Sequence, residues 1–204
     1  MNRRPDYLKP QLRRNLSNGF LYDLCEQYLE VTPPLAGRRS RAVSSARTSR
    51  LCTRTAASME PIRYLFPDVD VWLALSVPNH KDHARCHRWL RNLALNVRLC
   101  FCSVTQVGLL KRLTTGPAVV GEKVLHHDEA WDIRNVWALD QRIVFLGEPA
   151  EINEEFRAIS NLRHPNCKSW THLYLIAFAR VAGLHLVTMD KSLCDRSGDA
   201  ERLR

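Results

Sequence analysis

Residues 62–77 read IRYLFPDVDVWLALSV, and this stretch decides the fold class. The apolar run from Ile62 to Phe66 predicts a short buried strand that ends at the turn formed by Pro67 and Asp68. The apolar residues from Val69 to Val77 predict a helix that begins directly after that turn. A buried strand that leads straight into an apolar helix is typical of an α/β domain with a mainly parallel sheet.

The following residues repeat this alternation. Further strands are predicted at 99–102, 142–146 and 185–188, and further helices at 80–95, 104–113, 128–139, 149–159 and 170–182. Ser103 and Ser169 are the expected N-caps of two of these helices, and Gly183 is the expected end of the last one. Residues 195–204 are expected to form a polar tail. The pattern as a whole predicts the α/β class.

Composition limits the classes of protein to which the chain can belong. The chain has 204 residues, of which 45% are hydrophobic, so it can bury a core of ordinary size. None of its apolar runs reaches the roughly 18 residues that a membrane span requires, so no membrane association is expected. Its seven cysteines are an odd number without the spacing of a disulfide framework, which predicts a reducing, cytoplasmic location.

The net charge of +9 suggests nucleic-acid binding until it is divided along the chain. Residues 1–58 carry a net charge of +7, and residues 59–204 carry +2. We therefore expect two parts, a basic extension at 1–58 and a folded domain at 59–204. Gly37 to Ser58 contain six arginines and no acidic residue, a composition that predicts disorder.

Three interpretations of the extension follow from its composition. We favour a start codon placed too far upstream, with Met59 as the true first residue, because the domain-like pattern begins abruptly at Ile62. A transit peptide and a basic arm that contacts RNA are the alternatives.

Polar side chains follow the predicted strands at the edge where a parallel sheet binds ligands. Asp68 ends the first strand, Asp70 lies two residues later, and Asp190 follows the last strand. Gln106 and His172 lie in the first turns of two helices. Converging carboxylates suit hard cations such as Mg²⁺ or Mn²⁺. The alternative for each aspartate taken singly is a turn residue or a helix N-cap.

Four segments together resemble the VapC-like toxins among the PIN-domain ribonucleases. They read LFPDVDVWLAL at 65–75, VTQVGLLKRL at 104–113, WTHLYLIAFA at 170–179 and LVTMD at 186–190. The resemblance covers about residues 62–193. It implies a three-layer α/β/α sandwich and a metal-dependent endoribonuclease, usually the toxin of a type II toxin–antitoxin pair. The partners that it implies are an RNA substrate and a cognate antitoxin, and a homodimer stays open.

The resemblance also implies roles for individual residues. Asp68 and Asp190 fall on positions of acidic ligands for Mg²⁺ or Mn²⁺. Asp70 stands where the family usually has Asn, and Gln106 stands where many members have Glu. His172 departs from the family pattern, which has Asp at this position. A neutral imidazole binds Mn²⁺ well but suits Mg²⁺ poorly, so His172 is a candidate ligand and catalytic residue whose identity brings activity into question.

Three functions therefore remain open. The leading hypothesis is an active metal-dependent endoribonuclease toxin, favoured by Asp68, Asp70 and Asp190. The second is a catalytically impaired PIN-like domain that binds RNA or a protein, favoured by His172 and Gln106. The third is a frameshifted gene remnant, favoured by the extension and the polar tail.

Other clusters have structural interpretations. His80, His83 and His87 share one helix face, but three ligands fall short of a structural zinc site, and polar surface histidines are favoured. Cys100 and Cys102 share one face of a strand and are expected to be small buried residues. Core or interface positions, and not base-stacking platforms, are expected for the five tryptophans Trp72, Trp89, Trp131, Trp137 and Trp170.

Overall fold

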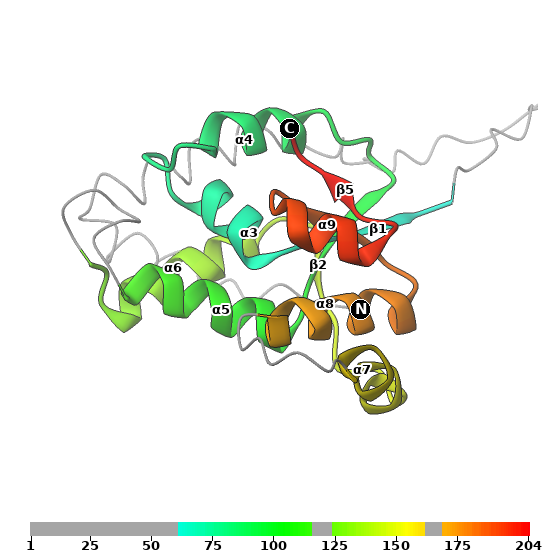
Figure 1. Ribbon diagram of the computed structural model, residues 1–204. Helices are drawn as coiled ribbons and strands as arrows, with labels where there is room; N and C mark the ends of the chain where they lie inside the picture. The colour runs from blue at the N-terminus through cyan, green and yellow to red at the C-terminus, as the bar shows by residue number, and fades with distance from the viewer. Residues whose placement is uncertain (1–60, 116–123, 162–168) are drawn as a thin grey trace, which may run out of the picture.

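The computed structural model describes residues 61–115, 124–161 and 169–204, and the extension predicted at 1–58 lies outside them. In the described chain, two helices follow each of the first three strands, and one helix lies between the last two strands (Figure 1). Their bounds are β1 Arg63–Pro67, α3 Val69–Ser76, α4 His83–Arg91, β2 Val97–Phe101, α5 Ser103–Thr114, α6 His127–Trp137, β3 Ile143–Phe145, α7 Ile152–Ser160, α8 Ser169–Ala182, β4 His185–Thr188, α9 Lys191–Ser197 and β5 Glu201–Arg202.

The five strands form one sheet in the order β3-β2-β1-β4-β5, and each neighbouring pair is parallel. Leu65 in β1 lies opposite Leu99 in β2 and His185 in β4. The α/β class with a parallel sheet is therefore confirmed. All strands of such a sheet end at the same edge, so residues that follow β1 and β4 are neighbours in space although they are far apart in sequence.

Helices cover both faces of the sheet, as expected for a three-layer α/β/α sandwich. Leu65 and Leu99 pack into a core formed with α3, α4, α5 and α6. The next residues along the same strands, Phe66 and Cys100, pack into a second core formed with α7, α8 and α9. This alternation follows from the period of two along a strand, and it buries both faces of the central strands.

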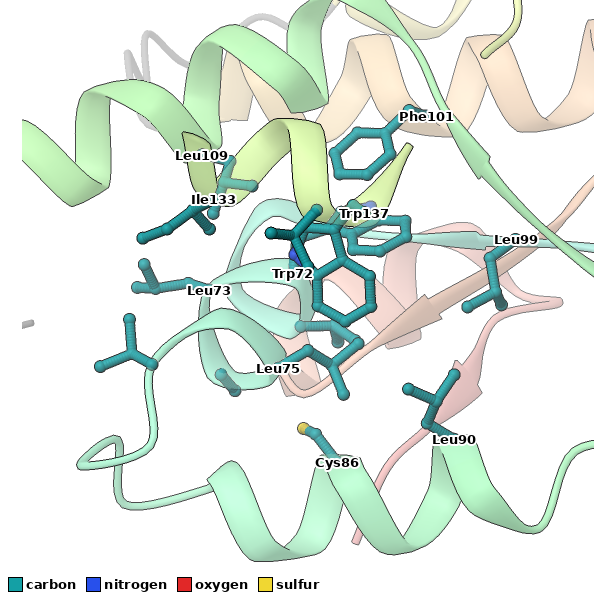
Figure 2. Close-up of a cluster of buried hydrophobic side chains, with 14 of the residues drawn as sticks. Trp72, Leu73, Leu75, Cys86, Leu90, Leu99, Phe101, Leu109, Ile133 and Trp137 are labelled. Atoms are coloured by element: carbon teal, nitrogen blue, oxygen red, sulfur yellow. The ribbon is translucent and has the colours of Figure 1, made fainter. Parts of the chain in front are cut away.

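An aromatic cluster fixes the helix that carries Asp68 to the sheet. The ring of Trp72 in α3 stacks on Phe101 in β2 with 3.8 Å between centroids, and it meets Trp137 in α6 edge-on at 5.2 Å (Figure 2). Trp137 Nε1 donates to Ser76 Oγ at 2.8 Å. The core positions predicted for Trp72 and Trp137 are confirmed, whereas Trp131 and Trp170 are 45% and 55% exposed.

Several predicted boundaries differ from the observed ones. The helix expected at 80–95 is the shorter α4, because two hydrogen-bonded turns, His80 N to Val77 O and His83 N to His80 O, come before it. Ser103 is the first residue of α5, and its N-cap is Cys102, whose N–H donates to Thr105 Oγ1 at 3.0 Å.

The segment expected as a polar tail at 195–204 is mostly polar and exposed, but it is folded, because it contains the end of α9 and strand β5. Gly198 ends α9 with a φ of +74°, a conformation that residues with a side chain adopt at a cost. Leu203 N then donates to Thr188 O at 2.9 Å, and the Leu203 side chain is buried. A two-residue strand has no hydrophobic period to detect. None of the described helices is long and apolar enough to cross a membrane.

Candidate functional site

Asp68 lies at the carboxyl end of β1 and begins helix α3. Its Oδ1 accepts the backbone N–H of Val71 at 2.8 Å, which makes it the N-cap of that helix. Its own N–H donates to Val187 O in β4 at 2.9 Å. The structural alternative of an N-cap is therefore confirmed for Asp68, and its functional role stays a prediction. The cap and the strand pairing together fix the direction in which this carboxylate points.

Thr188, the last residue of β4, connects Asp68 to Asp190. Its hydroxyl donates to Oδ2 of Asp68, and its oxygen accepts the backbone N–H of Asp190 at 2.9 Å. Oδ1 of Asp190 accepts from Leu193 N at 2.9 Å, so Asp190 is the N-cap of α9. Thr188 is not among the site residues predicted from the sequence. The signal available was a hydroxyl at the end of a strand, two residues before a candidate carboxylate.

The surroundings of Asp68 work against its ionisation. The side chain is 4% exposed, and burial, with smaller contributions from the negative charges of Asp70 and Asp190, raises its pKa from 3.8 to about 7. The hydrogen bonds from Thr188 and Val71 act in the opposite direction and lower this pKa. A positive charge nearby would therefore stabilise the ionised form of Asp68 and lower its pKa.

Asp70 and Gln106 both pair with arginines. Oδ1 of Asp70 lies 3.2 Å from a terminal nitrogen of Arg112, and both side chains are about half exposed, so this pair contributes little to stability. Oε1 of Gln106 accepts from Arg134 Nε at 2.7 Å. Gln106 is thereby tied to helix α6.

His172 lies in the first turn of α8, as predicted, and is half-buried. Across residues 61–115, 124–161 and 169–204, no three side chains of His, Cys, Asp and Glu gather closely enough to hold a metal ion. Asp70 and Asp190 each lie close enough to Asp68 for their charges to act on its carboxyl group. Mg²⁺ needs only one or two protein carboxylates, because it keeps several waters and takes phosphate oxygens as further ligands. Asp68 and Asp190 supply carboxylate oxygens of this kind at the ends of the neighbouring strands β1 and β4.

The histidines of the α4 region close the C-terminal end of α3. His83 Nδ1 pairs with Ala74 O at 2.7 Å, and His87 Nε2 pairs with Leu75 O at 3.1 Å. Burial is the main cause that lowers the pKa of His87 to about 4. The expectation of polar surface histidines is therefore only half right, because these side chains are half-buried and bind helix carbonyls that would otherwise have no partner.

The prediction for Cys100 and Cys102 is confirmed, since both are buried. Burial raises the pKa of Cys100 to about 12, which keeps its thiol protonated and unreactive. The four described cysteines, Cys86, Cys100, Cys102 and Cys194, are free thiols.

No protein-family model matches the chain. Two strains of Mycobacterium tuberculosis have a relative named ribonuclease VapC41, which is 34% identical to this chain over 142 residues. The match covers 68% of this chain and 97% of the relative. The chain belongs to the VapC ribonuclease family. The resemblance drawn from the four sequence segments is thus confirmed.

Three solved structures also match the chain. Mycobacterium tuberculosis VapC20, described as a toxin that cleaves the sarcin–ricin loop, matches with a TM-score of 0.48 and 12% identity over 64% of this chain and 93% of its own. Rickettsia felis VapBC2, bound to a DNA fragment from its promoter, matches with a TM-score of 0.49 and 12% identity over 68% of this chain and 96% of its own. FitAcB from Neisseria gonorrhoeae matches with a TM-score of 0.47 and 20% identity over 68% of this chain and 96% of its own.

Proposed function

We propose that this member of the VapC ribonuclease family is a metal-dependent endoribonuclease toxin. The observation that carries the proposal is the pairing of Asp68 and Asp190 through the hydroxyl of Thr188 at the carboxyl ends of β1 and β4. Ligands bind at this edge in open parallel sheets. We further propose Mg²⁺ or Mn²⁺ as the cofactor, an RNA substrate and a cognate antitoxin as partners, and a homodimer as the assembly to test.

Asp68 would hold the cation. Its two oxygens offer about four lone pairs, of which Val71 N and Thr188 Oγ1 engage one each. The remaining lone pairs are available to an ion. The raised pKa of Asp68 supports this role, because a cation beside the carboxylate would offset the burial that disfavours its ionisation.

Thr188 and Asp190 would complete the arrangement. The Thr188 hydroxyl fixes the orientation of Asp68, and its bond to Asp190 N fixes the backbone from which the second carboxylate projects. When bound there, Mg²⁺ or Mn²⁺ supplies activation of a water molecule and neutralisation of charge on the scissile phosphate. The two carboxylates would therefore act by holding the cation that contacts the scissile phosphate, with no covalent step on the protein.

His172 remains the third proposed ligand and catalytic residue. It lies in the first turn of α8, where the helix N-terminus favours negative charge nearby, including that of a phosphate. Because an imidazole nitrogen binds Mn²⁺ better than Mg²⁺, we expect Mn²⁺ to support more activity. Asp70 and Gln106 are proposed as secondary site residues.

Cleavage of labelled single-stranded RNA by the full-length protein tests this function. We expect cleavage with Mn²⁺ or Mg²⁺, none after chelation with EDTA, and a loss of at least about 100-fold for Asp68→Asn and Asp190→Asn. Asp199→Asn is the matched control, since it removes the same charge from an exposed side chain.

Three results would contradict the proposal in different ways. Cleavage that persists in EDTA would contradict the proposed metal dependence. Full activity of a folded Asp68→Asn variant would contradict the assignment of Asp68 to the active site. RNA binding without cleavage under all conditions would favour the impaired binding module.

A further inference from the structure

A cavity of about 210 Å³ lies at the carboxyl ends of β2 and β3, beside the candidate site. It is lined by Phe101, Arg134, Ala138, Ile143 and Phe145. Phe101 connects the cavity to the core, because its ring stacks on Trp72. Trp72 in turn meets Trp137 of α6, the helix that also supplies Arg134. The cavity therefore has a rigid apolar wall and one cationic side chain.

The guanidinium of Arg134 is a positive charge at this cavity, and in the described part of the chain no carboxylate pairs with it. Its Nε donates to Gln106 Oε1 at 2.7 Å, which fixes the plane of the guanidinium. Burial lowers the pKa of Arg134. Its two terminal nitrogens also have no hydrogen-bond acceptor among the described residues. A half-buried cation of this kind can gain free energy from an acceptor that a ligand brings.

Phe145 presents an aromatic ring at the same place. It is the last residue of β3 and is 48% exposed, although large apolar side chains are usually buried. The guanidinium of Arg134 lies over this ring, 5.9 Å from its centroid. Single-stranded RNA is bound by this combination, because its bases stack on aromatic rings and guanidinium planes while cations contact acceptors on the bases or phosphates.

The position of the cavity suits a nucleotide next to the cleaved bond. In the strand order β3-β2-β1-β4, the end of β3 is two strands away from the end of β1, which carries Asp68. Two strand spacings are about 10 Å. An RNA strand with its scissile phosphate near Asp68 can therefore place a neighbouring base at Phe145.

We propose that this cavity is a base-binding subsite, in which Phe145 stacks on an unpaired RNA base and Arg134 donates hydrogen bonds to acceptors on that base. Gln106 is a positioning residue, since it touches the ligand only through Arg134. The subsite rests on the proposed function in taking RNA as its ligand. It deepens that function by naming the residues that select which nucleotide flanks the cleavage position.

Binding of a short single-stranded RNA that carries 2-aminopurine at each position in turn tests the subsite. The protein carries Asp68→Asn, and EDTA is present, so that the probe stays intact. We expect fluorescence quenching at one position of the RNA. Adding Phe145→Leu removes that quenching and weakens binding by about 5- to 150-fold, the loss expected for one stacked base. Adding Arg134→Lys also weakens binding, because a lysine lacks the planar fork.

Tyr64→Leu is the matched control, because Tyr64 is an exposed aromatic in β1 toward the opposite edge of the sheet. It leaves both quenching and affinity unchanged. Gln106→Leu weakens binding, whereas Gln106→Glu restores it, since a carboxylate also accepts from Arg134 Nε. Thermal melting of each variant verifies that the fold is intact.

The outcomes separate the subsite from the catalytic proposal. Unchanged RNA binding and quenching by folded Phe145→Leu and Arg134→Lys variants overturn the subsite, and cleavage by the protein without substitutions still supports the proposed function. Conversely, weaker RNA binding by these variants supports the subsite even if no condition gives cleavage. An effect of Phe145→Leu on capture of a cognate antitoxin, with none on RNA, overturns the subsite and assigns the cavity to a protein partner.

Discussion

The hydroxyl of Thr188 donates to the buried carboxylate of Asp68, across the pairing of β1 with β4. The same oxygen accepts the N–H of Asp190 at 2.9 Å. One hydroxyl therefore controls the orientation and the protonation of one proposed ligand and the backbone position of the other.

Thr188→Val tests this control, because valine has nearly the same shape but no hydroxyl. We expect RNA cleavage to fall by about 10- to 100-fold, the range for residues that orient metal ligands. The lost hydrogen bond also raises the pKa of Asp68, so activity should require a higher pH. A pH–rate profile measures both effects. Thr188→Ser keeps the hydroxyl and should restore the profile. If Thr188→Val cleaves RNA with an unaltered profile, the hydroxyl has no such role.

Asp68 should make the metal-free protein less stable as the pH rises. Its carboxyl ionises near pH 3.8 in the unfolded chain and near pH 7 in the fold. Between these values the folded protein binds more protons, so the free energy of unfolding falls with rising pH and levels off above about pH 7. The full effect is on the order of 4 kcal/mol. Asp68→Asn should remove this slope, and added Mg²⁺ should restore stability at pH 8. Thermal melting in EDTA at pH 5 and pH 8 measures the difference between the two proteins, and equal slopes would contradict the shift.

His172→Asp should increase cleavage in Mg²⁺. His172 is the proposed third ligand, so the substitution exchanges an imidazole for a carboxylate at that position, and the first turn of α8 tolerates the added charge. Without metal, the new charge should raise the pKa of at least one of Asp68 and Asp190. Cleavage assays that titrate Mg²⁺ and Mn²⁺ measure the change in preference. The double variant with Asp68→Ala should be inactive. Cleavage unchanged by His172→Asp would place residue 172 outside the metal site.

Gly108 allows α5 to approach the start of α3. A Cβ at this position would lie 2.6 Å from Val69 Cγ2, and Val69 follows Asp68 directly. Gly108→Ala should therefore destabilise the fold by about 1–3 kcal/mol and reduce cleavage, since the clash displaces the turn that holds Asp68. Gly147→Ala is the control, because a Cβ there meets nothing within 4 Å. Denaturant unfolding measures the loss, and Val69→Ala should recover part of it. Equal stability of the Gly108 and Gly147 variants would refute this packing argument.

The sequence was sufficient to predict the sheet and the two central carboxylates, because both depend on local pattern. Asp68 and Asp190 each follow a short apolar run that is itself predicted as a strand, so both could be found without any knowledge of their partners. The four ordered segments then supplied the family.

Thr188 and Arg134 could not be predicted in the same way. Thr188 acts on a carboxylate 120 residues earlier in the chain, and Arg134 acts on an amide 28 residues earlier. Neither separation leaves a periodic signal. The position of Gly183 in a left-handed turn, with a φ of +64°, was predictable because glycine is favoured there.

Strand β5 has a further consequence for handling the protein in solution. It lies at one end of the sheet, where it pairs with β4 and exposes the charged side chains of Glu201 and Arg202. A short, charged edge is a poor template for another chain. Deleting residues 201–204 would leave the unpaired backbone of β4, which is apolar at Leu186 and Val187, open to a second molecule. Residues 201–204 thus protect the edge of β4 from pairing with another molecule. We expect the protein that lacks them to self-associate increasingly as its concentration rises.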